Sequence, residues 1–290
     1  MKAVMETPLK LQCKVRTLDL SQRTAIMGIV NVTPDSFSDG GDCMDPEAAL
    51  QRARIMVEEG ADIIDVGGES TRPKGMYGEG AKKVSVQEEL DRVIPVIERI
   101  SQTMDTIISV DTYKSEVAHE ALNAGASMVN DISGLRYDAH LARVAAQHHA
   151  ALVVMHIQGT PETMQQHPEY QDVVREVKEE LRRSADKAQS DGVRSIVIDP
   201  GFGFGKNLEH NLALLKHLGS FRELGYPILV GTSRKGFIGT LLNLPVDQRI
   251  EGTAATVAVS IMNGANIVRV HDVKEMKRVA VVTDAIMKNA

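Results

Sequence analysis

The chain has 290 residues, of which 43% are hydrophobic, so it can bury a full core without disulfides or a structural metal. A formal net charge of −6 and an aromatic content of 3% exclude nucleic acid and an anionic membrane as principal partners, because both need a basic surface. Two cysteines are too few for a disulfide framework, which indicates a cytoplasmic protein. No apolar run is long enough to span a bilayer.

The N-terminal part differs in pattern from the rest of the chain. Residues 11–20 (LQCKVRTLDL) alternate apolar and polar side chains, which predicts an antiparallel hairpin strand. We expect residues 1–24 to form an extension that plugs one end of a single domain spanning residues 25–290.

Eight short apolar segments rich in Val and Ile follow, and their lack of alternation is typical of a parallel sheet covered on both faces. They are residues 25–30, 62–66, 106–110, 127–130, 151–155, 195–198, 227–230 and 266–270. Segments with helical spacing accompany them, at residues 46–60, 86–101, 114–124, 139–149, 173–190, 208–218, 249–263 and 273–288. Gly60, Gly125 and Gly264 each follow a helix, where a left-handed cap is needed.

Eight β-then-α units in a chain of this length predict a closed (β/α)8 TIM barrel, with an open doubly wound sheet as the alternative. Each predicted strand ends in a polar or charged residue. In a barrel these ends converge on one rim, whereas an open sheet would spread them along an edge.

Cationic side chains follow strands that a barrel makes neighbours. Arg72 follows the second strand, and Arg269 and His271 end the eighth, on either side of Asn31 after the first. Guanidinium groups fork onto phosphate oxygens, so we expect a phosphate or diphosphate site. Surface ion pairs are the alternative for either arginine.

Acidic and amide side chains follow the third, fourth and sixth strands, and we expect them to face the cations from the opposite wall. These are Asp111, Asn130 and Asp199. A carboxylate only accepts hydrogen bonds, so the set could read the N–H edge of a guanine-like or pterin-like ring. A hard metal ion is a rival ligand, and Asp111 could instead cap the following helix.

The segment GFGFGK at residues 201–206 is neither a dinucleotide fingerprint nor a Walker A loop. We expect its glycines to allow sharp turns that fold Phe202 or Phe204 over a bound ring, with core packing as the alternative for one of the two rings. Lys235 is expected to donate to a carbonyl or an anion rather than form a Schiff base. Residues 31–42 and 70–80 are expected to be mobile lids.

From Ala25 onward the chain resembles the dihydropteroate synthase family along nearly its whole length. The specific blocks are MGIVNVTPDSFSDGG at residues 27–41 and GTSRKGFIG, while ADIIDVGGESTRP at 61–73 and VNDISG are shared more broadly by pterin-binding barrels. The resemblance implies a TIM barrel, a homodimer, and condensation of 6-hydroxymethyl-7,8-dihydropterin diphosphate with 4-aminobenzoate. The products would be 7,8-dihydropteroate and diphosphate, with Mg²⁺ as cofactor and sulfonamides as competitors of 4-aminobenzoate.

The resemblance also implies roles for particular residues. The pterin would be held by Asp111, Asn130, Met155, Asp199, Phe204, Gly231, Ser233 and Lys235. The diphosphate would be held by Asn31, Thr71, Arg72, Arg269 and His271, with Asn31 also binding Mg²⁺. The aminobenzoate would lie against Phe37, Ser38, Asp39, Pro73, Arg234, Lys235 and Gly236.

Five of these residues are expected to act in catalysis, namely Asn31, Asp111, Lys235, Arg269 and His271. One position departs from the family: Gly236 stands where relatives commonly carry Ser or Arg, so the contact with the aminobenzoate carboxylate would differ here.

Physical chemistry favours a dissociative step, in which diphosphate leaves and the pterin ring delocalises the positive charge before the amine attacks. Two alternatives remain: a pterin-carrying barrel of a corrinoid methyltransferase system, and a non-catalytic small-molecule binding barrel. The former would need neither the diphosphate residues nor the lid motif.

Overall fold

The protein is described by a computed structural model that covers residues 9–33, 45–70 and 83–288. Within these ranges no helix is both long and apolar enough to cross a membrane. The expected lid residues 34–42 and 71–80 lie outside the described ranges.

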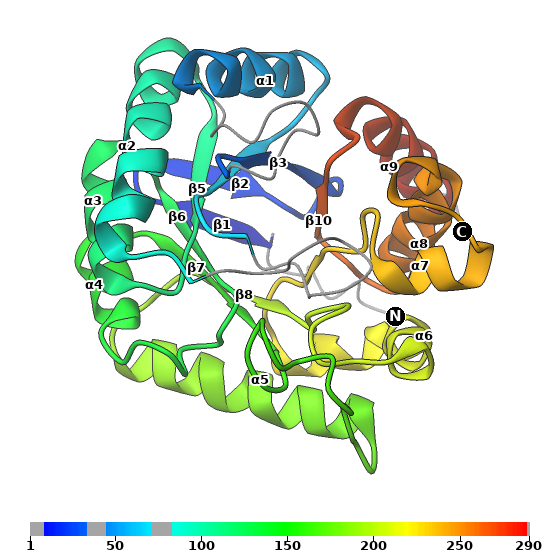
Figure 1. The fold of residues 1–290 in the computed structure, drawn as a ribbon. Helices are drawn as coiled ribbons and strands as arrows, with labels where there is room; N and C mark the ends of the chain where they lie inside the picture. Colours follow the sequence, from blue (N-terminus) through cyan, green and yellow to red (C-terminus); the bar gives the residue numbers. More distant parts are fainter. Residues whose placement is uncertain (1–8, 34–44, 71–82, 289–290) are drawn as a thin grey trace, which may run out of the picture.

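Eight parallel strands form the central sheet, as the sequence predicts (Figure 1). They are β3 (Ala25–Asn31), β4 (Ile63–Gly67), β5 (Ile107–Asp111), β6 (Met128–Asp131), β7 (Ala151–Met155), β8 (Ile196–Asp199), β9 (Leu229–Val230) and β10 (Ile267–Val270). Their order is β8-β7-β6-β5-β4-β3-β10-β9. Ile198 N–H donates to Pro227 O at 3.0 Å and Ile198 bridges Ile228 in parallel, so β8 and β9 meet and the sheet is a nearly closed barrel. This observation excludes the open-sheet alternative.

Helices surround the barrel (Figure 1). They are α1 (Pro46–Glu58), α2 (Val86–Thr103), α3 (Ser115–Ala124), α4 (Leu141–Gln147), α5 (Val173–Ser190), α6 (Leu208–Lys216), α7 (Gly236–Leu242), α8 (Ile250–Met262) and α9 (Val273–Lys288). The main apolar core lies between the outer faces of the strands and these helices. The expected glycine caps are confirmed, since Gly60, Gly125 and Gly264 have φ of +102°, +126° and +104°.

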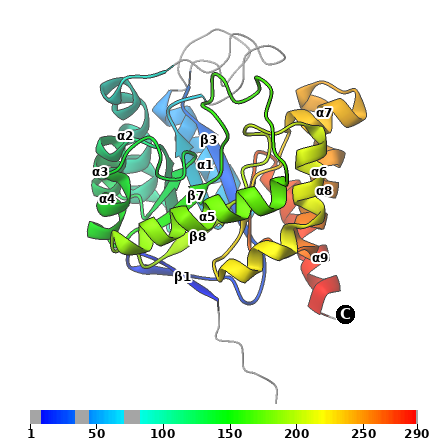
Figure 2. The same cartoon turned by 90° about the horizontal axis from the view of Figure 1, so that it is seen from below.

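The N-terminal hairpin is confirmed as a plug. β1 (Lys10–Cys13) pairs antiparallel with β2 (Arg16–Asp19), and Figure 2 shows β1 beneath one end of the barrel. Leu11 and Leu18 share an apolar cluster with inward-facing strand residues such as Met27 and Met128. The hairpin therefore closes the end of the barrel where the strands begin.

One helix was not predicted. α7 follows Lys235 directly, in a segment that contains Gly236 and Gly239 and has weak helix propensity. Tertiary packing stabilises it, because Phe237 and Ile238 are buried in the main core. The expected helix at 139–149 is also shorter at both ends, where residues 139–140 form a turn and His149 has a positive φ.

Candidate functional site

The strand register places four residues in one row at the carboxyl end of the barrel, one from each of four adjacent strands. Asn31 pairs with Gly67, Gly67 with Asp111, and Asp111 with Asn130. Gly67 has no side chain, and a Cβ placed there would lie 3.4 Å from the Asp111 Cβ and 3.7 Å from the Asn31 Oδ1. Asn31 and Asp111 therefore face the same small space across Gly67.

Arg269 occupies the centre of this end of the barrel. Its Nη2 donates to Asp111 Oδ2 and its Nε donates to Asp65 Oδ2, both at 2.6 Å. Asn130 Nδ2 donates to the same Asp65 oxygen at 3.1 Å. Arg269 and Asp111 thus face each other across the mouth, as expected, and they form an ion pair because β10 and β5 both project their side chains toward the barrel axis.

Burial changes the proton affinity of these groups. Desolvation raises the pKa of Asp111, and the Arg269 guanidinium opposes that rise. Desolvation also lowers the pKa of Arg269, but Asp65 and Asp111 outweigh it and the net pKa rises. The arginine is thus a fixed cation held between two acids.

Asp199, at the end of β8, is buried near the cationic side chains of Lys235, Lys206 and Arg269. Burial raises its pKa to about 6, although Gly201 N–H donates to Oδ1 at 2.7 Å and Lys235 attracts its charge. The residue begins a tight turn rather than capping a helix, as Pro200 and the glycines predict. A carboxyl group poised in this way can accept from or donate to a polar ring edge.

The two phenylalanines of the GFGFGK segment lie in different apolar clusters. Phe202 is buried in the main core, whereas Phe204 lies in a separate cluster with Met155, Ile132, Ile157 and Met164. This small cluster includes two of the predicted pterin residues, Met155 and Phe204, which come from β7 and from the turn after β8.

Lys235 completes this wall of the site. Its Nζ lies 4.0 Å from the centroid of the Phe204 ring, a cation–π geometry. A Cβ on Gly203 would lie 3.2 Å from the Lys235 Cδ, so the bare glycine lets the lysine stem cross the turn. The ammonium is thereby held against an aromatic face beside Asp199.

Ser233 and His271 join the ends of β9 and β10. Ser233 Oγ accepts from the His271 backbone N–H at 3.2 Å and lies 3.1 Å from His271 Nδ1. If the hydroxyl donates to Nδ1, the imidazole proton resides on Nε2, which makes Nε2 a donor. Gly231 lies beside them, 3.9 Å from the Arg269 Cβ when a Cβ is placed on it.

Arg234 has a partner of its own. Its guanidinium binds Asp272 through Nε at 2.9 Å and Nη2 at 2.5 Å, a forked ion pair. Arg249 Nη1 donates to the Arg234 carbonyl at 3.0 Å. These bonds fix the backbone around Lys235 and Gly236, and Asp272 competes with any substrate carboxylate for Arg234.

The chain was compared with known proteins. The family model described as "Pterin binding enzyme" matches residues 27–271. The dihydropteroate synthase of Bacillus subtilis is 48% identical over 279 residues, which are 96% of this chain and 93% of that protein. The chain belongs to the dihydropteroate synthase family of pterin-binding enzymes.

Solved structures agree with this family. The Yersinia pestis dihydropteroate synthase in a sulfonamide drug complex superposes with a TM-score of 0.90 at 43% identity and covers 97% of this chain and 100% of that chain. The Xanthomonas albilineans dihydropteroate synthase with 4-aminobenzoic acid gives a TM-score of 0.88 at 43% identity, covering 97% and 99% of the two chains. The TIM barrel predicted from the sequence is therefore confirmed for this member of the family.

Several predicted contacts of the family site lie outside the described residues. These are Phe37, Ser38 and Asp39 in one segment and Thr71, Arg72 and Pro73 in the other. The described part brings together Asn31, Asp111, Asn130, Asp199 and Arg269 at the barrel mouth.

Asp65 was missed by reasoning from the sequence. It lies inside β4 in the apolar segment DIIDV and is fully buried, with Oδ2 bound to Arg269 and Asn130. An acidic residue within an apolar parallel strand was the available signal, because such a residue must find a partner inside the barrel.

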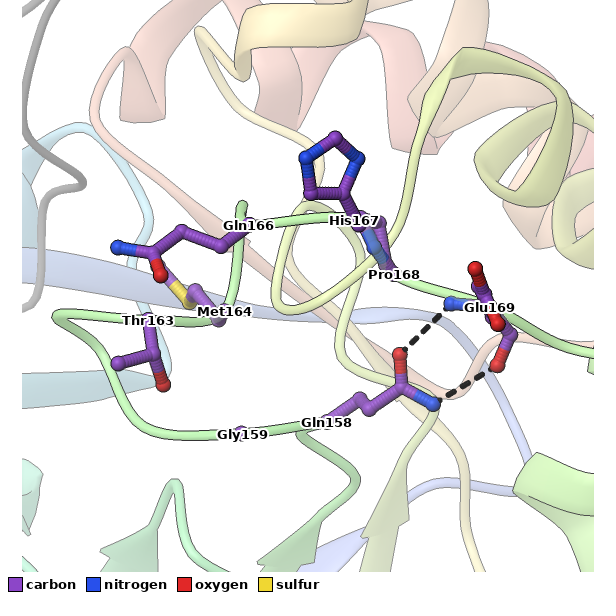
Figure 3. A pocket seen from close by; sticks show the side chains of 8 residues that line it. All are labelled: Gln158, Gly159, Thr163, Met164, Gln166, His167, Pro168 and Glu169. Carbon is purple, nitrogen blue, oxygen red and sulfur yellow. Dashed lines mark hydrogen bonds between the residues drawn. The ribbon is translucent and has the colours of Figure 1, made fainter.

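A surface hollow of about 340 Å³ lies beside the mouth, in the loop that follows β7 (Figure 3). Gln158 ties the two arms of this loop together, donating to Glu169 O at 2.9 Å and accepting from Glu169 N–H at 3.1 Å. Met164 is shared between the hollow and the Phe204 cluster. The loop thus forms an outer wall on the Phe204 side of the mouth.

Among the described residues no group of three or more His, Cys, Asp and Glu could hold a metal ion. Asn31 therefore stands as a candidate ligand without a protein cage. Mg²⁺ commonly takes one or two protein oxygens and completes its shell with water and substrate phosphates, so a lone carboxamide fits a metal that arrives with a diphosphate.

Proposed function

We propose that the protein condenses 6-hydroxymethyl-7,8-dihydropterin diphosphate with 4-aminobenzoate to give 7,8-dihydropteroate and diphosphate, a step of folate biosynthesis. The observation that carries this proposal is the arrangement at the mouth: Asp111, Asn130 and Asp199 converge there, beside the Lys235 ammonium on the Phe204 ring. Hydrogen-bond acceptors next to an aromatic face and a cation suit a polar bicyclic ring.

The pterin would lie with its N–H edge toward Asp199 and Asn130 and one face on Phe204 and Met155. Lys235 would donate to the ring carbonyl, and Gly231 and Ser233 would line the pocket beside Arg269. Support comes from the short distances between these side chains, which come from different strands and meet at the barrel mouth.

The diphosphate would lie toward the ends of β3 and β10. Asn31, His271 and Arg269 would donate to it, together with Thr71 and Arg72. Support for His271 is the Ser233 hydroxyl, which orients the ring so that Nε2 can carry a proton toward the anion. For Arg269, the bonds to Asp65 and Asp111 use Nε and Nη2, and neither bond uses Nη1.

Asn31 would also hold Mg²⁺ through its carboxamide oxygen, beside the diphosphate oxygens. When bound, the ion supplies positive charge that neutralises the leaving diphosphate.

We propose that the carbon–oxygen bond to diphosphate breaks before the new bond forms. Asp111 and Asp199 would stabilise the cationic pterin electrostatically, and Arg269 and His271 would hold the departing anion. The aryl amine then forms the carbon–nitrogen bond and loses one proton. No side-chain nucleophile is needed, because the neutral aryl amine itself attacks the pterin cation.

The 4-aminobenzoate, and sulfonamides in competition with it, would lie against Phe37, Ser38, Asp39 and Pro73 on the outer side of the pterin. Its carboxylate would be met by Lys235 or the Gly236 backbone. Arg234 is a weaker candidate than the sequence indicates, because Asp272 already holds both ends of its fork.

We further propose a homodimer that works in the reducing cytoplasm. Support for the dimer comes from the adjacent helices α8 and α9, which carry exposed large apolar side chains: Val259, Met262, Val281, Val282, Ile286 and Met287. Such a patch marks an interaction surface. Support for the compartment is Cys13, a buried free thiol.

The decisive experiment supplies the purified chain with pterin diphosphate, 4-aminobenzoate and Mg²⁺ and measures 7,8-dihydropteroate. Product that depends on all three additions supports the proposal. Binding of the pterin without turnover would instead indicate a carrier or binding barrel and would contradict it.

A further inference from the structure

Lys206 ends the GFGFGK segment and lies beneath the turn that follows β8. Its side chain is buried, and the residue is 2% exposed. Its Nζ lies 2.9 Å from each of three atoms, the Gly201 carbonyl, the Phe204 carbonyl and the His156 Nδ1. No role was predicted for this lysine, because only the fold turns its side chain inward.

The three contacts match the chemistry of an ammonium group. A protonated lysine has three N–H donors and no acceptor, so the three contacts at 2.9 Å can use all three donors, and the His156 carbonyl is a fourth, longer contact at 3.4 Å. His156 must then present a lone pair on Nδ1 and carry its proton on Nε2, which lies 3.4 Å from Glu180 Oε2. Burial and the nearby Lys206 lower the pKa of His156, in agreement with a neutral ring.

The turn that Lys206 contacts is costly to order, because its glycines lose much conformational entropy. Gly201, Gly203 and Gly205 have φ of +71°, +79° and +64°, and such a flexible segment needs fixed points to keep one shape. Bonds to the carbonyls at both ends supply them. Phe204, at the second of these ends, presents its ring to the Lys235 ammonium, which lies 4.0 Å from the ring centroid.

We propose that Lys206 is a positioning residue for pterin binding. By binding the Gly201 and Phe204 carbonyls it fixes the Phe204 ring beneath Lys235, and so sets the shape of the pterin face. Lys206 itself touches no substrate atom in this arrangement. The inference rests on the proposed function, since it assigns the Phe204 wall to the pterin.

The alternative is a lysine that only fills space. Burying a cation is costly, and an apolar side chain of similar length would fill the same volume at lower cost. Burial lowers the pKa of Lys206 to about 7, with Asp199 and Glu180 favouring the charge and Lys235 and Arg136 opposing it. The presence of lysine at this position, in place of an apolar side chain, therefore indicates that its three hydrogen bonds matter and not only its volume.

The test replaces Lys206 by Met, which keeps the length and removes the donors. Binding of 6-hydroxymethyl-7,8-dihydropterin without its diphosphate is measured by calorimetry at pH 6.5. We expect the Kd of Lys206→Met to rise about 10-fold, the effect of losing one charged hydrogen bond. At saturating pterin diphosphate, the KM for 4-aminobenzoate should stay within about 2-fold, because none of the contacts proposed for that substrate belongs to the turn.

A double-mutant comparison separates positioning from general stability. In a Phe204→Leu background, Lys206→Met should change the Kd by less than about 2-fold, because the ring that it positions is gone. The matched control is Lys187→Met: Lys187 also donates to a backbone carbonyl, that of Leu135 at 2.8 Å, but on α5 away from the turn. It should bind the pterin as the wild type does.

An unchanged Kd in Lys206→Met, or an equal effect with and without Phe204, would overturn the proposal. If Lys206→Met does not unfold cooperatively, the comparison is repeated with Lys206→Gln. Failure of both variants to fold would show that Lys206 is needed for overall stability, and this result would also overturn the proposal. A wild type that binds no pterin would instead contradict the proposed function.

Discussion

Arg269 Nη2 lies 2.6 Å from Asp111 Oδ2, although 158 positions separate the two residues along the chain. The contact joins β10 to β5 across the barrel mouth. It couples the cation expected to hold diphosphate with an acid expected to hold the pterin, so neither half of the proposed site is electrostatically independent of the other.

Arg269→Ala is therefore expected to impair both halves. It removes a fixed donor and leaves Asp65 and Asp111 without their shared cation. We expect kcat/KM to fall about 10²-fold or more, as for the loss of one preorganised donor. The control is Arg99→Ala, which removes an exposed pair with Glu47. Turnover near that of the wild type in Arg269→Ala would refute the role of Arg269.

The raised pKa of Asp199 predicts that the free energy of unfolding depends on pH. Its pKa is about 6 in the fold and 3.8 in its ordinary state, so the folded protein holds the proton more tightly. This contribution to the free energy of unfolding is complete below about pH 4 and is lost as the pH rises through about 6. Urea unfolding across this range should show a smaller fall with rising pH in Asp199→Asn than in the wild type. Equal slopes would contradict the shift.

Two glycines with similar backbone angles should respond differently to alanine. Gly201 has φ of +71° and its Cβ would collide with the His156 carbonyl, whereas Gly225 has φ of +79° with nothing within 4 Å. Gly225→Ala should lower the free energy of unfolding only by the cost of a left-handed conformation for alanine, about 1–2 kcal/mol. Gly201→Ala should lower the free energy of unfolding by about 1–3 kcal/mol more, because the backbone must move to make room for the Cβ. Equal losses in urea unfolding would show that the turn is loosely packed.

The dissociative step can be tested without the second substrate. Incubation of the enzyme with Mg²⁺ and pterin diphosphate, but no 4-aminobenzoate, should release diphosphate slowly, because water can capture a cationic pterin. The release is measured with a coupled diphosphate assay and compared with an enzyme-free control. No release above that control would favour a concerted displacement.

The proposed dimer should depend on the apolar face of α8 and α9. Changing Val282 and Ile286, which are 60% and 57% exposed, together to Glu should convert the wild-type dimer to a monomer in light scattering. The control is Val15→Glu on the hairpin, where the side chain is 96% exposed. A wild-type mass of one chain would contradict the dimer.

Much of the fold could be predicted because its signals are local. Short Val- and Ile-rich segments and helical spacing identify strands and helices, and the polar residues after each strand predict the mouth. α7 escaped because the Gly236 segment has weak propensity and gains its stability from burying Phe237 and Ile238 in the main core.

The position of the candidate site residues at the barrel mouth was predictable, and their contacts were less so. Asp111, Asn130, Asp199 and Arg269 all lie at the mouth, as the strand ends indicate. The partner of each did not follow from sequence, and the buried roles of Asp65 and Lys206 were missed because both side chains find their partners across the barrel or across a turn.

The sequence by itself determined the eight β-α units, the hairpin, the glycine caps and the polar strand ends, since these depend on side-chain periodicity and on the backbone freedom of single residues. Only the tertiary structure decided that the barrel closes between β8 and β9, that Phe204 rather than Phe202 faces the mouth, and that Arg269 binds Asp65 and Asp111. These outcomes depend on which side chains meet at the barrel axis, and strand register sets that across long stretches of chain.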